Sequence, residues 1–156
     1  MFDSNFNVIY GDTKTGRTSF LLDIALLLKQ NDFKSFFLSC STEFQNSRKI
    51  EPFDEFRVLP SSDEFNNLKN IEVIDEITRS KNYNFIIVDD IDYLSSNCVS
   101  ALSKIEAKKI VTCLTHNNIN LPKDSNFYNI EDTNIEIVKD YMISLKRDKK
   151  INSILK

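Results

Sequence analysis

The sequence predicts an α/β fold in which a parallel sheet is flanked by helices. Short runs of β-branched and aromatic residues alternate with longer segments of helical periodicity, which is the pattern of βαβ units. The run Phe85–Val88 contains no polar residue, as expected of a strand that is covered on both faces. Polar clusters follow several of the predicted strands, at the edge where parallel sheets bind their ligands.

The first half of the chain predicts three strands and one helix. Asn7–Tyr10 is the first predicted strand, and the apolar segment Thr18–Gln30 is the first helix. Apolar residues lie on nearly all sides of this helix, so we expect it to be wedged between the sheet and neighbouring elements. Ser35–Cys40 predicts a second strand buried on both faces. The polar stretch 41–54 predicts loop or a short helix, and Phe56–Leu59 predicts a short third strand.

The second half begins with a helix start signal at Ser61–Glu64, which is followed by apolar residues at helical spacing. Phe85–Val88 is the next predicted strand. It is followed by a short amphipathic helix over Asn97–Ala107 and by a fifth strand over Lys109–Leu114. Phe127–Ile130 is a candidate for one more strand.

The length of 156 residues suits a single domain. We therefore predict a single domain over residues 1–156, in which 131–156 forms a peripheral or partner-binding tail. The apolar residues of this tail fit one helix and also fit two edge strands, and the sequence leaves both alternatives open.

Composition and charge argue against several function classes. A net charge of −3 argues against a surface that coats nucleic acid uniformly. No apolar run reaches the length that spans a membrane, so we expect no membrane partner. Cys40, Cys98 and Cys113 show neither pairing nor zinc-type spacing. We therefore expect reduced thiols and an intracellular location, either cytoplasmic or nuclear.

The only two glycines, Gly11 and Gly16, lie five residues apart between the first strand and the first helix. Glycine lets backbone N–H groups curl around phosphate oxygens, and the start of a helix presents a partial positive charge to the anion. The segment predicts a phosphate-binding loop of the type G-x-x-x-x-G-K-[ST], with Arg17 in place of the lysine. A plain strand-to-helix turn is the alternative. The predicted binding residues are Gly11, Asp12, Thr13, Lys14, Thr15, Gly16, Arg17 and Thr18.

Nucleotide hydrolysis also needs a divalent metal and a carboxylate that positions or activates water. Thr18 offers a hydroxyl to Mg²⁺, and Asp89, at the end of an apolar strand, is its predicted acidic partner. Glu43 and Asp90 are alternative catalytic carboxylates. His116 is the sole histidine and a candidate donor to the γ-phosphate. An ordinary surface glutamate and an incidental histidine are the alternatives for Glu43 and His116.

Together these residues resemble the core of a RecA-like P-loop NTPase, the group of recombinases, their paralogues and hexameric replicative helicases. The resemblance implies a three-layer parallel sheet flanked by helices, with Glu43 as catalytic base and His116 near a polar residue that is usually Gln. It also implies that the loop Asn117–Asn126 faces single-stranded DNA. It covers about residues 5–126 and rests on Gly11–Thr18, Ser39–Glu43, Phe85–Asp90 and Thr112–Asn117.

The resemblance implies an ATP-binding domain that acts with Mg²⁺ in DNA recombination, repair or replication. It further implies a homo-oligomer or an assembly with other proteins, and single-stranded DNA is a candidate partner. The cations Lys139, Lys146, Arg147, Lys149 and Lys150 form the best basic patch, which a solvated helix face explains equally well.

Arg17 argues for weak or lost hydrolysis, because a guanidinium is wider and more rigid than an ammonium. Two alternatives therefore stay open. One is a non-enzymatic adaptor that retains the fold. The other is an AAA+ initiator or loader, because Asp89–Leu94 resembles the acidic motif of that class.

Overall fold

The computed structural model describes residues 2–12, 15–39, 55–58, 64–80, 83–116 and 120–155. Within them, six parallel strands form one sheet in the order β3–β2–β4–β5–β1–β6. The strands are β1 (Phe6–Tyr10), β2 (Ser35–Ser39), β3 (Phe56–Val58), β4 (Phe85–Asp89), β5 (Lys108–Cys113) and β6 (Asn126–Asn129). The α-helices are α1 (Arg17–Gln30), α2 (Glu64–Ser80), α3 (Ser96–Ser103) and α4 (Ile135–Leu155), and the 3-10 turns are η2 (Ile91–Tyr93) and η3 (Ile130–Asp132).

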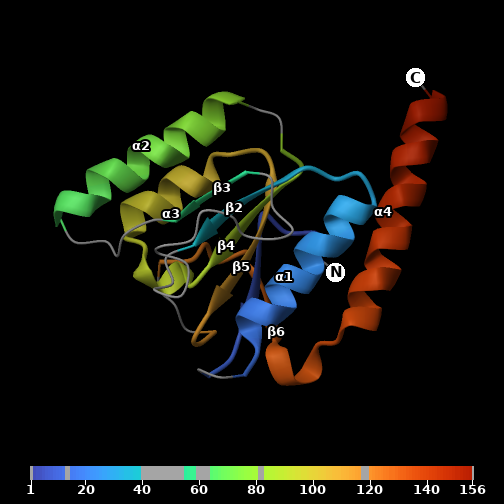
Figure 1. Cartoon of the computed structure of the whole chain (residues 1–156), viewed down its shortest axis with the longest axis horizontal. Coiled ribbons are helices and arrows are strands. Elements are labelled where there is room, and N and C mark those ends of the chain that lie inside the picture. Colours follow the sequence, from blue (N-terminus) through green and yellow to red (C-terminus); the bar gives the residue numbers. More distant parts are fainter. Residues whose placement is uncertain are drawn as a thin grey trace.

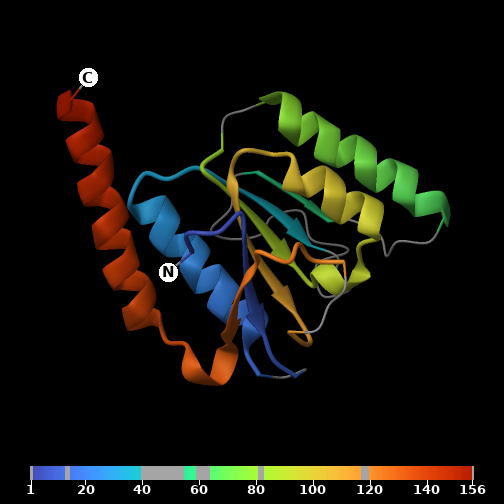
Figure 2. The same cartoon turned by 180° about the vertical axis from the view of Figure 1, so that it is seen from behind.

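Helices cover both faces of the sheet, which gives a three-layer α/β/α arrangement (Figure 1). α2 and α3 pack on one face, and α1 and α4 lie side by side on the other, as the reverse view also shows (Figure 2). Successive strand residues point to opposite faces, so Val88 and Val111 face α2 and α3, whereas Ile87 and Ile110 face α1 and α4. The predicted α/β fold with a parallel sheet flanked by helices is confirmed.

One stripe of α1 is buried against the sheet and α4. Leu21, Ile24, Ala25 and Leu28 form this stripe, at the spacing of three and four residues that keeps side chains on one helical face. Leu26 is 43% exposed. The prediction that α1 is wedged between the sheet and neighbouring elements is confirmed, since it packs between the sheet and α4, although its Leu26 side is exposed.

The tail is the helix α4, which decides between the two alternatives that the sequence leaves open. Val138, Tyr141 and Met142 are buried against the α1 face of the sheet. The Tyr141 hydroxyl donates to the Phe2 carbonyl at 3.2 Å, and the Phe2 and Tyr141 rings pack edge to face with centroids 5.4 Å apart. The buried side chain of Phe2 thus anchors the helix from the other end of the chain.

The predicted helix Asn97–Ala107 is shorter in the structure, where α3 covers Ser96–Ser103. Ser95 caps its start, because the Ser95 hydroxyl accepts from the Cys98 N–H at 3.3 Å. Beyond the helix, Lys109 is fully buried and donates through Nζ to the Ile105 carbonyl and to Asn5 Oδ1. This contact draws the segment after α3 toward the amino end of β5.

Some predicted elements lie outside the described residues, namely the stretch 41–54 and the start signal at Ser61. None of the helices in the described part of the chain combines the length and the apolar character needed to cross a membrane.

Candidate functional site

The candidate residues that the structure describes gather at the carboxyl ends of the strands β1, β5 and β4. β5 lies between the other two. The glycine loop leaves β1 and leads into α1, and the two aspartates end β4. One strand therefore separates the loop from the carboxylates, and neighbouring strands are about 4.8 Å apart.

Asp89 is fully buried and meets Thr18 across this edge. The Thr18 hydroxyl lies 3.0 Å from Asp89 Oδ2 and 3.2 Å from Oδ1. Strand alternation explains the meeting, because Ile87 faces α1 and Asp89 is two residues further along the same strand. Thr18 is the second residue of α1, so the start of the helix stands directly over this carboxylate. A threonine hydroxyl beside a carboxylate is a pair of oxygen ligands of the kind that Mg²⁺ takes.

Thr112 on β5 joins the two aspartates. Its hydroxyl donates to Asp89 Oδ1 at 2.7 Å and accepts from the Asp90 N–H at 2.8 Å. Buried carboxylates need such donors, because an unpaired charge is costly away from water. The sequence prediction did not assign Thr112 to the site. The only signal was one hydroxyl inside the apolar run Ile110–Leu114.

Asp90 follows with its backbone in the left-handed region, at φ 56°, which residues other than glycine adopt rarely. Arg17 Nη2 lies 3.7 Å from Asp90 Oδ1, and the two side chains are 10% and 19% exposed. Arg17 Nη1 is buried and has no hydrogen-bond acceptor among the described residues. The Arg17 guanidinium, at the lysine position of the loop pattern, thus faces the Asp90 carboxylate through Nη2, whereas its Nη1 has no acceptor among the described residues.

The two glycines are required for different physical reasons. A Cβ at Gly11 would overlap the Ile130 side chain of η3. Gly16 has φ 83°, and a Cβ there would meet no atom within 4 Å, so its conformation rather than its space favours glycine. Thr15 closes the turn by donating through its hydroxyl to the Asp12 carbonyl at 2.6 Å. Thr13 and Lys14 lie outside the described residues.

His116 lies beyond the end of β5 and is exposed. Its ring packs on Tyr10 at the end of β1, with the ring centroids 5.2 Å apart. This contact places the imidazole at the same edge of the sheet, next to β1 rather than in a hydrogen bond with Asp89 or Asp90. Glu43 lies outside the described residues.

Asp92 is a further residue of this edge that the site prediction omitted. Its Oδ2 accepts from the Leu114 N–H at 3.0 Å, which ties the turn after β4 to the end of β5. Burial, together with the negative charge of Asp92, raises the pKa of the Cys113 thiol to about 12. Cys113 therefore stays protonated at neutral pH and is a packing residue rather than a nucleophile.

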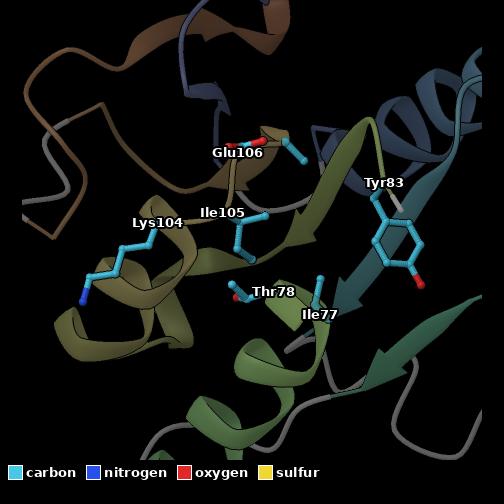
Figure 3. Close-up of a pocket in the computed structure, with 7 residues that line it drawn as sticks. Ile77, Thr78, Tyr83, Lys104, Ile105 and Glu106 are labelled. Carbon is cyan, nitrogen blue, oxygen red and sulfur yellow. The ribbon is translucent and has the colours of Figure 1, made fainter. Parts of the chain in front are cut away.

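A separate pocket of about 260 Å³ lies at the opposite, amino edge of the sheet (Figure 3). None of the predicted site residues lines it. Its walls come from the end of α2, from Tyr83 before β4 and from the segment between α3 and β5, and they comprise Ile77, Thr78, Tyr83, Lys104, Ile105, Glu106 and Ala107.

No protein-family model matches this sequence, and no curated protein is significantly similar to it. Among the described residues, no group of three or more His, Cys, Asp or Glu is placed to hold a metal ion.

Proposed function

We propose that this chain is a nucleotide-binding domain of the P-loop NTPase type, similar to the RecA-like group. Backbone amides of the loop Gly11–Thr18 hold the phosphates, and Thr18 and Asp89 hold Mg²⁺ directly or through water. The observation that carries the proposal is the hydrogen bond from Thr18 to the buried Asp89, at 3.0 Å. Thr18 lies at the start of α1, where a bound anion is favoured, and Asp89 is a carboxylate that binds the Mg²⁺ accompanying that anion.

The sheet topology supports this proposal. The helix that follows β1 and the helix that follows β4 cover opposite faces of the sheet. Open α/β sheets bind ligands outside the carboxyl ends of their strands, where the loop and Asp89 lie. β5 lies between β1 and β4, and the Thr18 hydroxyl at the start of α1 reaches Asp89 across this strand at 3.0 Å.

The remaining candidate residues have separate roles in hydrolysis. Asp90 or Glu43 positions the attacking water, and His116 contacts the terminal phosphate. Hydrolysis is slow, because the Arg17 guanidinium is a poor substitute for the compact lysine charge. We further propose that the domain acts as one subunit of an assembly in DNA recombination, repair or replication, and that single-stranded DNA contacts the exposed cations of α4.

Equilibrium binding of ATP with and without Mg²⁺ tests the proposal. We expect Asp89→Asn to abolish the gain in affinity that Mg²⁺ gives, because the amide keeps one acceptor for Thr18 and Thr112 but loses the charge. Asp75→Asn, an exposed carboxylate of α2, is the matched control and should leave the gain intact. Undetectable binding at millimolar nucleotide would refute the proposal and leave the adaptor alternative.

The AAA+ alternative is favoured by one observation, the position of Asp90 directly after Asp89 and in contact with Arg17. Turnover of the variants separates the two classes. In a RecA-like site, Glu43→Gln abolishes ATP hydrolysis without weakening ATP binding. In the AAA+ alternative, Asp90→Asn has that effect and Glu43→Gln hydrolyses ATP at the original rate.

A further inference from the structure

We propose that Asp90 competes with a bound phosphate for the Arg17 guanidinium, so that the pair Arg17–Asp90 is the closed state of the site. This inference rests on the proposed nucleotide function and concerns its regulation.

The first step is the position of Arg17. It is the first residue of α1 and directly precedes Thr18, so its side chain starts from the turn at which the proposed phosphates bind. The side chain is only 10% exposed, and its Nη2 lies 3.7 Å from Asp90 Oδ1. The guanidinium is therefore held inside the carboxyl edge rather than extended into solvent.

The second step is the unused donor of Arg17. Nη1 is buried and has no acceptor among the described residues. Buried donors are nearly always paired, because an unpaired donor loses its hydrogen bonds to water without replacement. A guanidinium holds its donors in a planar fork that suits the paired oxygens of a phosphate. The missing acceptor is thus of the kind that a phosphate oxygen supplies.

The third step is the fixed position of Asp90. Its N–H donates to Thr112, and its backbone has a φ of 56°. Aspartate is one of the few residues besides glycine that adopt this left-handed conformation. Together with the hydrogen bond to Thr112, it fixes the backbone from which the carboxylate reaches Arg17.

The consequence is a competition between two anions for one cation. In the ligand-free protein the Asp90 carboxylate neutralises Arg17, whereas a phosphate must take over the guanidinium to bind. The carboxylate that is released then faces the bound phosphate, where the proposed function needs a group that positions water. Phosphate binding and the freeing of Asp90 are therefore one event.

Titration calorimetry with ADP in the absence of metal tests this competition, because ADP is not hydrolysed and Asp89 then holds no Mg²⁺. We expect Asp90→Asn to bind ADP about tenfold more tightly than the unmodified protein, the effect of removing one competing, partly buried charge. Asp90→Gly, which suits the positive φ, should show the same gain and serves if the asparagine variant folds poorly. Asp92→Asn is the matched control for loss of a nearby negative charge, and we expect it to change the affinity by less than about twofold.

A double-mutant cycle makes the test specific to Arg17. Arg17→Gln should weaken ADP binding, and adding Asp90→Asn to it should give no further change. An equal gain with and without Arg17, or a gain as large in Asp92→Asn, would overturn the competition. ADP binding that is unchanged in Asp90→Asn would also overturn it and leave the proposed function standing. Absence of ADP and ATP binding in every variant would instead refute the proposed function and this inference with it.

Discussion

The Thr112 hydroxyl on β5 donates to Asp89 Oδ1 on β4 at 2.7 Å. The register places the two residues side by side, because Val111 pairs with Val88 one position earlier. The same hydroxyl accepts from the Asp90 N–H, so one side chain fixes both the carboxylate of Asp89 and the backbone of Asp90. The site is thus built on neighbouring buried strands, where a side chain has little freedom to move.

Replacement of Thr112 by valine tests this arrangement. Thr112→Val keeps the shape of the side chain, but it removes a donor from Asp89 and an acceptor from Asp90. We expect the free energy of unfolding to fall by about 1–3 kcal/mol, the cost of leaving buried polar groups without partners. Urea denaturation measures the change. Thr112→Ser retains the hydroxyl and should lose clearly less stability, so equal losses in the two variants would show that the methyl group matters and the hydroxyl does not.

The hydroxyl of Thr18 is predicted to serve the metal. We expect Thr18→Val to weaken binding of ATP in the presence of Mg²⁺ by about tenfold, and to change binding without Mg²⁺ much less, because the loop amides remain. Thr18→Ser should bind as the unmodified protein does. Calorimetric titrations with and without Mg²⁺ give both affinities. A valine variant that keeps the full effect of Mg²⁺ would remove Thr18 from the metal site.

Thr18, Asp89 and Thr112 show what the sequence predicts and where it falls short. Thr18 and Asp89 are predictable, because each has a fixed position relative to a local signal, the second glycine and the end of an apolar strand. Thr112 is not, because its role depends on β5 lying beside β4, and strand order is a property of the whole chain. A threonine within a strand is otherwise an ordinary β-forming residue.

The tail, residues 131–156, shows in the same way that contacts distant in the sequence decide part of the fold. The apolar residues of 131–156 suit a helix and two edge strands alike, and packing decides between them. Tyr141 reaches the carbonyl of Phe2, a contact between opposite ends of the chain that no local pattern reveals. The sheet itself was predictable, because its central strands are apolar runs of strand length that alternate with helical segments.

Gly11 is predicted to be required for space. Gly11→Ala places a methyl group against the Ile130 side chain, so we expect a loss of stability of about 1–3 kcal/mol, typical of overpacking. Ile130→Ala alone also destabilises, because Ile130 is buried. The double variant should lose less stability than the sum of the losses in the two single variants, since the shorter side chain makes room for the methyl group. Thermal or urea unfolding of the four proteins measures this coupling, and strictly additive losses would contradict the proposed contact.

The pKa of Lys109 predicts how the free energy of unfolding changes with pH. Burial lowers the pKa of this lysine in the folded protein from 10.5 to about 8. Between these two values the unfolded chain holds the proton more than the folded chain does, so stability rises as pH increases from about 8 toward 10.5. Below pH 8 the cost of burying the charged form is fully present.

Urea denaturation across this pH range should show the rise in the free energy of unfolding in the unmodified protein and a weaker dependence on pH in Lys109→Met. Lys104→Met, at an exposed position, is the control and should retain the rise. A rise of equal size in Lys109→Met would assign it to another group.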